Sequence, residues 1–197
     1  TATVTNTVAE SITISGTLDA AAITDTAAIT FTVGSADPTN GNTTLAATPT
    51  SVVADGATTS SVTVTLADAN SNLLSASGGT VVLSATGSAV ISAVTDNADG
   101  TYTATVTNTV AESITISGTL DAAAITDTAA ITFTVGSADP TNGNTTLATT
   151  PTSVVADGAT TSSVTVTLAD ATGNLLSASG GTVVLSATGS AVISAVT

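Results

Sequence analysis

Side chains with oxygen donors are the groups of this 197-residue chain whose type and spacing could do chemistry, namely bind a cation. One group lies in a segment rich in Pro, Gly and Asn that occurs twice, at 35–42 and 137–144. Carboxylates and amides on a loop are the ligands that Ca²⁺ prefers, so these residues are candidate calcium ligands. The alternative is a turn whose polar side chains are solvated. The candidates are Asp37, Asn40, Asn42, Asp139, Asn142 and Asn144, with Glu10, Asp19 or Asp25 available to complete the shell.

A second acidic segment, at 96–100, places Asp96 and Asp99 in one tight connection. A bound cation would relieve the repulsion between the two carboxylates. The interpretation we favour is a hairpin in which Gly100 adopts a positive φ. The segment 68–72 resembles the start of an EF-hand loop. It lacks the Gly at the sixth position and the Glu at the twelfth, so we predict a turn there.

The composition excludes most other chemistry. The chain has no Lys, Arg, His, Cys, Met or Trp, and its 14 acidic residues give it a formal net charge of −14. Without cationic side chains it cannot neutralise phosphates, which excludes nucleic-acid binding. Without His, Cys or Lys, only a glycosidase-like carboxylate pair remains, so we expect no enzyme activity. No run approaches the roughly 18 apolar residues of a spanning helix, so we expect no membrane insertion.

The chain contains a long internal repeat. Residues 1–95 return as residues 103–197 with an offset of 102 residues, and only three of these 95 pairs differ. The differing pairs are Ala47/Thr149, Asn70/Thr172 and Ser71/Gly173. A period of this length is one small domain, so the chain is expected to be part of a domain array. Near-identical copies suit a spacer or a fibre better than a catalyst.

Short alternating segments must form the elements that position these side chains. In 61–66, Val62, Val64 and Leu66 alternate with polar residues. Alternation with period two over β-branched residues predicts half-buried strands. The same pattern, less regular in the last three segments, occurs at 101–106, 113–116, 130–135, 51–54, 80–85 and 89–94. The alanine-rich segment 19–28 and its copy 121–130 are predicted to be strand–loop–strand passages rather than a helical turn.

About seven short strands per repeat and no helix predict an all-β fold of tandem antiparallel β-sandwiches. Aliphatic side chains fill the interior of each sandwich, and Thr side chains face water. Tyr102 is predicted to point inward, with its hydroxyl on a backbone partner at the corner of the sandwich.

The linker chemistry of 37–42 predicts where the repeats begin and end. Residues 37–138 form one complete repeat, residues 1–36 are the last strands of a preceding repeat, and residues 139–197 are the first strands of a following one. Each end piece alone would expose an apolar face and an unpaired sheet edge. We therefore expect neighbouring repeats of the same polypeptide, or other copies, to complete them.

Three segments, 54–56, 62–72 and 96–106, together resemble bacterial Ig-like domains of the invasin/intimin type, which occur as tandem repeats in large surface adhesins. The second copy of the turn, at 170–174, matches the Asp-x-x-Gly-Asn pattern of that family better than the first copy does. The chain departs from antibody-type Ig domains by lacking the Cys pair and the core Trp. It departs from typical relatives by lacking every basic residue, which puts in doubt any receptor contact that a basic residue would make.

The resemblance implies an Ig-like sandwich, an extracellular, cell-surface location and a role in extending an adhesive tip from the cell. It also implies calcium, because several arrays of this kind are stiffened by Ca²⁺ at domain junctions. The predicted function is a mechanical spacer in a long adhesin or extracellular fibre. Two alternatives stay open: a subunit of a self-assembling filament or sheath, and a calcium-dependent binding module. A surface glycan or protein ligand is expected to bind elsewhere in the full-length protein.

Overall fold

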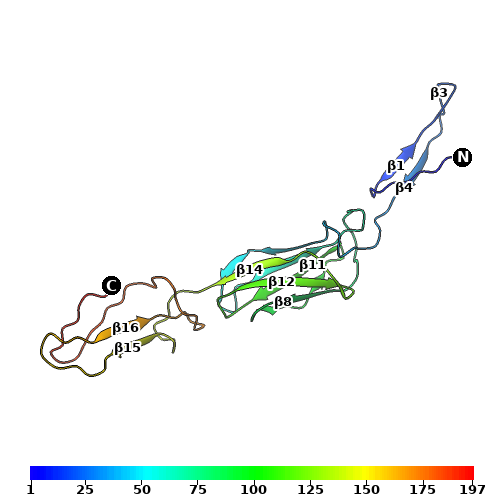
Figure 1. Cartoon of the computed structure of the whole chain (residues 1–197). Coiled ribbons are helices and arrows are strands. Elements are labelled where there is room, and N and C mark those ends of the chain that lie inside the picture. Colours follow the sequence, from blue (N-terminus) through cyan, green and yellow to red (C-terminus); the bar gives the residue numbers. More distant parts are fainter.

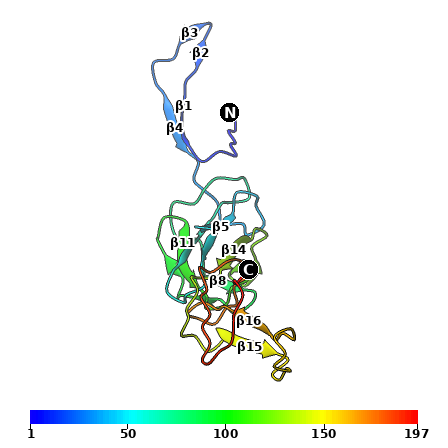
Figure 2. The same ribbon diagram turned by 90° about the vertical axis from the view of Figure 1, so that its left-hand side faces the viewer.

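The computed structural model describes residues 1–197 and consists of strands and their connections. No segment is a helix with the length and apolar character needed to cross a membrane. Figure 1 shows three parts in a line: a thin N-terminal hairpin, a central sandwich, and a C-terminal part with one strand pair. The view turned by 90° in Figure 2 shows the same order, so the molecule is elongated along one axis.

The N-terminal part contains β1 (Ser11–Ile14), β2 (Thr17–Leu18), β3 (Ala21–Ala22) and β4 (Ala27–Thr30). The central part contains β5 (Thr44–Thr48), β6 (Ser51–Val53), β7 (Ser60–Thr65), β8 (Val81–Ala85), β9 (Val90–Ile91), β10 (Thr95–Asp96), β11 (Thr101–Thr107), β12 (Ser113–Leu120), β13 (Ala123–Ala124) and β14 (Ala129–Thr134). The C-terminal part contains β15 (Thr146–Thr150) and β16 (Ser163–Thr167).

The central part is a two-sheet sandwich. One sheet has the order β10-β11-β7-β5, with β9 also paired to β11. The other has the order β13-β12-β14-β6, with β8 also paired to β12. All pairs are antiparallel except β6 with β14, because the chain crosses from the first sheet to the second between β5 and β6. The predicted all-β, Ig-like sandwich is therefore confirmed.

Alternation along the strands builds the core. Val62 and Val64 of β7 and Val106 of β11 are fully buried, and on the opposing sheet Ile116 and Phe133 meet them in one apolar cluster. Burial of each such side chain stabilises the fold by roughly 1.5–3 kcal/mol. The intervening Thr residues point outward and pair across strands on the solvent side of the sheet, as the sequence pattern predicts.

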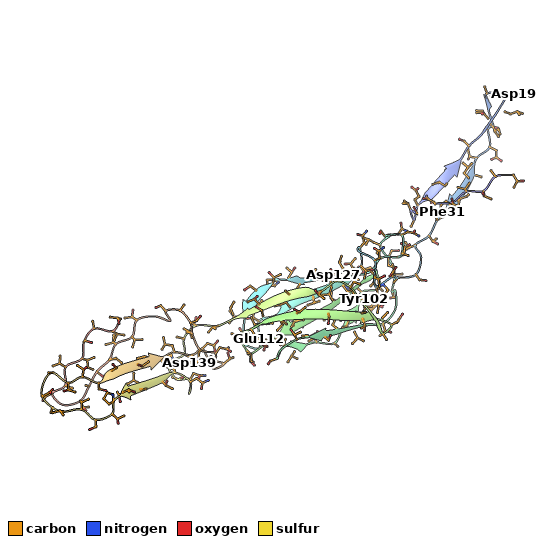
Figure 3. All side chains as sticks on the ribbon, in the orientation of Figure 1. Asp19, Phe31, Tyr102, Glu112, Asp127 and Asp139 are labelled. Carbon is orange, nitrogen blue, oxygen red and sulfur yellow. The ribbon has the colours of Figure 1, made fainter.

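Tyr102 closes one end of the sandwich. Its ring is buried, its hydroxyl accepts a hydrogen bond from the N–H of Gly78 at 3.0 Å, and it donates to the carbonyl of Gly79 at 2.7 Å. These bonds fix the loop that leads from β7 into β8. They are the backbone contacts that the sequence predicts for the hydroxyl of Tyr102. Figure 3 places Tyr102 at the end of the sandwich that faces the N-terminal part.

The alanine-rich segment 121–130 contains β13, a loop and the start of β14, as predicted. The structure adds a tight turn between β12 and β13, in which Asp121 and Ala122 have φ values of 47° and 69°. Two consecutive positive φ values are those of a type I′ hairpin turn, which usually has Asn-Gly. The sequence Asp-Ala gave no such signal, so this short hairpin was not predicted.

The two end parts contain only two-stranded sheets, β1–β4, β2–β3 and β15–β16. Leu147 in β15 is 62% exposed, whereas its counterpart Leu45 in β5 is 3% exposed. Val164 in β16 is 40% exposed, and its counterpart Val62 is fully buried. Since the local sequence is nearly the same, the difference comes from the opposing sheet that is present only in the central part.

Candidate functional site

The feature that joins consecutive parts of the molecule is a five-residue turn, 68–72 in the first copy and 170–174 in the second. We call it the junction turn. In the second copy Asp170 is only 2% exposed. Its Oδ1 accepts the backbone N–H groups of Thr172 at 3.0 Å and Asn174 at 2.9 Å. An Asp at the first position of such a turn replaces a missing backbone acceptor, which is why the residue type fixes the local fold.

The other carboxylate oxygen of Asp170 reaches back toward the central sandwich. Its Oδ2 accepts the backbone N–H of Gly136 at 2.9 Å. Gly136 follows the last strand of the sandwich, β14, by two residues. Asp170 therefore holds the turn of the following repeat against the end of the preceding one.

Asn174 makes a two-bond contact with the connection between β11 and β12. Its Oδ1 accepts the backbone N–H of Ala111 at 2.9 Å, and its Nδ2 donates to the carbonyl of Thr109 at 3.0 Å. The same Nδ2 group donates to Asp170 Oδ2 at 3.0 Å. One side-chain amide thus satisfies a donor and an acceptor of the preceding repeat and ties both to the buried carboxylate.

The first copy repeats this arrangement. Asp68 Oδ2 accepts the N–H of Gly34 at 2.8 Å. Asn72 Oδ1 accepts the N–H of Ala9 at 2.9 Å, and Asn72 Nδ2 donates to the carbonyl of Thr7 at 2.9 Å. We call each Asp/Asn pair, Asp68 with Asn72 and Asp170 with Asn174, a junction clamp.

The linker that carries the predicted calcium ligands braces the junction turn. Asp37 Oδ1 accepts the N–H and the hydroxyl of Thr39, at 2.8 and 2.7 Å. Asn40 Oδ1 accepts the N–H of Asn42 at 2.8 Å, and Asn42 Nδ2 donates to the carbonyl of Ser71 at 3.3 Å. The second linker repeats these bonds with Asp139, Asn142 and Asn144, where Asn144 Nδ2 lies 3.0 Å from the carbonyl of Gly173.

Charge and hydrogen bonding at the clamp favour the ionised acids. The side-chain N–H of Asn72 and then the backbone N–H of Gly34 lower the pKa of Asp68 to about 2. Burial by itself raises the pKa of Asp170, but the N–H of Gly136 and the side chain of Asn174 outweigh it, so its net pKa lies well below the ordinary value. Both clamps therefore carry a negative charge at neutral pH that only N–H and O–H groups contact.

The predicted calcium ligands do not form one cluster. Asp96 ends β10 and Asp99 lies in the turn that follows; each accepts a nearby backbone N–H, from Ala98 and Thr101, and Gly100 has a φ of 86°. This is the hairpin that the sequence favoured. Asp19 lies at the far tip of the N-terminal hairpin, distant from the linker (Figure 3).

No group of three or more acidic side chains is close enough together to hold a metal ion. Asn40 and Asn42, with their copies, are the predicted ligands that the fold brings to the junction. Calcium binding at the linker stays a prediction, because Asp37 Oδ1 and Asn40 Oδ1 would have to exchange their present N–H donors for the ion.

The sequence reading missed the role of Asn72 and Asn174. The signal was present, because both lie in the segment that was read as a turn and two of the three repeat differences fall there. The likeness of this segment to an EF-hand loop suggests a cation as its partner, whereas the partners are main-chain groups of another repeat. Those partners, among them Thr109 and Ala111, have no distinguishing side-chain chemistry and give no sequence signal.

Comparison with known proteins identifies the domain type. A family model described as "Invasin, domain 3" matches residues 39–136 and 141–197. The crystal structure of invasin, described as a bacterial integrin-binding protein, is 27% identical with a TM-score of 0.58, and the match covers 88% of this chain and 34% of that one. A search among curated proteins gives no match.

Two further structures show the same fold. InvD of Yersinia pseudotuberculosis is 23% identical over 86% of this chain and 52% of its own, with a TM-score of 0.58. FdeC, described as an Escherichia coli adhesin, is 23% identical over 85% of this chain and 52% of its own, with a TM-score of 0.54. The chain spans about a third of the length of the invasin structure that it matches. The resemblance inferred from the sequence is confirmed: this chain belongs to the invasin domain 3 family of bacterial Ig-like adhesin domains.

Proposed function

We propose that this chain is a non-catalytic spacer segment in the stalk of a long bacterial cell-surface adhesin. The observation that carries the proposal is the junction clamp, which occurs with the same partners at both joints. A joint built from two side chains that each bond the preceding repeat resists bending more than a bare linker does. Near-identical repeats that share the same clamp contacts extend a chain by a fixed step without adding a new binding surface.

Each sandwich resists extension through two kinds of interaction. Backbone hydrogen bonds of the β-ladders run across the pulling direction, and a cluster of buried Val, Ile, Leu, Tyr and Phe side chains holds the two sheets together. The long strands β11 and β12 lie roughly along the molecular axis (Figure 1), so force applied at the ends acts along them. The function we assign is therefore mechanical.

The relatives support an adhesive context. Invasin is described as an integrin-binding protein and FdeC as an adhesin. For this chain we propose that any glycan or protein ligand binds a different part of the full-length protein, and that the repeats hold that part away from the cell. The absence of Lys and Arg supports a ligand site outside these repeats, because it removes the side chains that bind acidic surfaces most readily.

We propose that strands of neighbouring repeats, or of other copies, complete the two end parts. The observation that favours this is the open apolar face of β15 and β16, where Leu147 and Val164 are exposed although Leu45 and Val62 are buried. Completion within one polypeptide gives a thread, and completion by other copies gives a filament. The filament is thus the second candidate function, and electron micrographs distinguish isolated threads from ordered bundles.

Small-angle X-ray scattering of the full 197-residue chain tests the spacer. We expect a maximum dimension and a scattering profile that one extended rod reproduces, and a loss of that fit in the double variant N72A/N174A. The matched control is N97A, which removes an Asn whose side chain bonds only within its own hairpin, to Thr101 and Thr103. A scattering profile of the unaltered chain that requires freely jointed parts would reject the spacer.

A further inference from the structure

Two of the three differences between the repeats fall inside the junction turn. Asn70 and Ser71 of the first turn are replaced by Thr172 and Gly173 in the second. The third difference, Ala47/Thr149, lies in the first strand of each repeat, on β5 and β15. Two of the three differences therefore fall in the turn that contacts the preceding repeat, and one falls on a strand.

Thr172 makes a contact across the joint. Its Oγ1 lies 2.9 Å from the carbonyl oxygen of Ala54, a buried residue of the preceding repeat that follows β6. The same Oγ1 accepts from Asn174 Nδ2 at 2.8 Å and lies 2.8 Å from Asp170 Oδ1. The single proton of the hydroxyl lies between two acceptors, Asp170 Oδ1 and the Ala54 carbonyl, and no other group donates to that carbonyl.

Residues 1–197 contain no counterpart of the Ala54 carbonyl at the first joint, so Asn70 and Thr172 are compared through their own chemistry. The side chain of Asn70 is exposed and takes part in no hydrogen bond, and its backbone N–H contacts Asp68. Thr172 is likewise exposed at the same position of the turn, but its hydroxyl lies 2.9 Å from the buried Ala54 carbonyl. The β-branched hydroxyl of Thr is short enough to lie between the clamp and the Ala54 carbonyl.

The second substitution relaxes the turn itself. Ser71 has a φ of 69°, a conformation that a residue with a Cβ adopts at a cost, and Gly173 has a φ of 92°. A Cβ placed at Gly173 would lie 2.9 Å from Asn144 Nδ2. With glycine there, Asn144 Nδ2 approaches the turn carbonyl to 3.0 Å, compared with 3.3 Å between Asn42 Nδ2 and Ser71.

We infer that positions 70/71 and 172/173 set the stiffness of each joint, and that Thr-Gly makes a tighter joint than Asn-Ser. The interaction surface is the junction turn, and its partner is the end of another repeat of the same kind, with the Ala54 carbonyl as the added acceptor. This inference rests on the proposed spacer function. Its consequence is that bending of the array concentrates at joints with Asn-Ser turns.

Amide hydrogen exchange of the full chain tests the inference, because the N–H groups of Ala111 and Gly136 donate across the second joint and those of Ala9 and Gly34 across the first. Replacing Thr172 by Val keeps the side-chain shape and leaves the Ala54 carbonyl unpaired. We expect exchange at Ala111 and Gly136 to become about threefold to tenfold faster, the range for loss of one hydrogen bond. Exchange at Ala9 and Gly34 stays unchanged.

Two further variants sharpen the test. T172N/G173S gives the second joint the turn of the first and should accelerate exchange at Ala111 and Gly136 at least as much as T172V. The matched control is T149A, which restores the residue of the first repeat away from the joint and should change neither rate. If the exchange rates of Ala111 and Gly136 are unchanged in T172V, the inference is wrong, but the proposed spacer function is unaffected. Unprotected reporters at both joints of the unaltered chain overturn the spacer as well.

Discussion

Asn174 and Ala111 belong to successive repeats, yet the side-chain Oδ1 of Asn174 accepts the backbone N–H of Ala111 at 2.9 Å, in the way that one strand accepts from its neighbour. The Nδ2 of the same amide completes the pair on the carbonyl of Thr109 at 3.0 Å. A side-chain amide has the donor and acceptor of a peptide group, so Asn174 extends β-type pairing across a joint where no strand crosses. Side-chain hydrogen bonds to main-chain groups therefore help to specify the joint.

Replacing Asn174 by Ala should loosen the second joint without unfolding the central sandwich. The variant loses two bonds to the preceding repeat and leaves the N–H of Ala111 without its partner, a change of about 1–3 kcal/mol in the free energy of joint opening. Hydrogen exchange at Ala111 measures the opening, and exchange at Val64 in the core reports on the sandwich. Equal acceleration at both positions would mean that the joint and the sandwich open together, contrary to this prediction.

The first joint should withstand acid until the pH approaches 2. The side-chain N–H of Asn72 and the backbone N–H of Gly34 lower the pKa of folded Asp68 to about 2. An Asp in an unfolded chain titrates near ~3.9, so the stabilisation from this depressed pKa is complete above about pH 4 and is lost as the pH falls through about 2. The amide shift of Gly34, followed against pH, measures the transition. In D68N that transition should be absent.

The fold could be predicted from the sequence because its determinants are local. The alternation of Val62, Val64 and Leu66 fixes which face of a strand is buried, and the same rule located Tyr102 and Phe133. The turn at Gly100 was predictable for the same reason, since Asp-Gly at a hairpin has a specific backbone requirement. The tight turn between β12 and β13 escaped prediction because its two positive φ values fall on Asp121 and Ala122 rather than on an Asn-Gly pair.

The candidate site was only half predictable. The Asp-x-x-x-Asn spacing around Asp68 identifies a turn, because an Asp side chain at its first position bonds the N–H groups that follow. What the turn contacts is set by how one repeat lies on the next, and the partner groups are main-chain atoms of residues such as Thr7 and Ala9. Main-chain partners have no sequence signature, so their identity required the structure.

Replacing Tyr102 by Phe should destabilise the central sandwich by about 1–2 kcal/mol, because the N–H of Gly78 and the carbonyl of Gly79 lose their partner while the buried ring is kept. Denaturant unfolding of the full chain, followed by the circular dichroism of the strands, measures the change in the free energy of unfolding. The matched control is T105V on the same strand, at an exposed position, which should stay within about 0.5 kcal/mol of the unaltered chain. A Y102F variant as stable as T105V would show that the hydroxyl bonds contribute nothing net.

The calcium proposal predicts a specific response at the linkers. Asp37 Oδ1 now accepts the N–H of Thr39, and Asn40 Oδ1 accepts the N–H of Asn42. An ion bound to these two oxygens would replace both hydrogen bonds. Calcium should therefore raise the melting temperature and shift the amide signals of Thr39 and Asn42, and a chelator should reverse both effects. The variant N40S/N142S, which keeps a shorter oxygen at each linker, should weaken the response, whereas N97A should not. If the melting temperature and the linker amide signals stay the same with calcium and with chelator, the junction clamps alone stiffen the joints, and the metal has no part in the spacer.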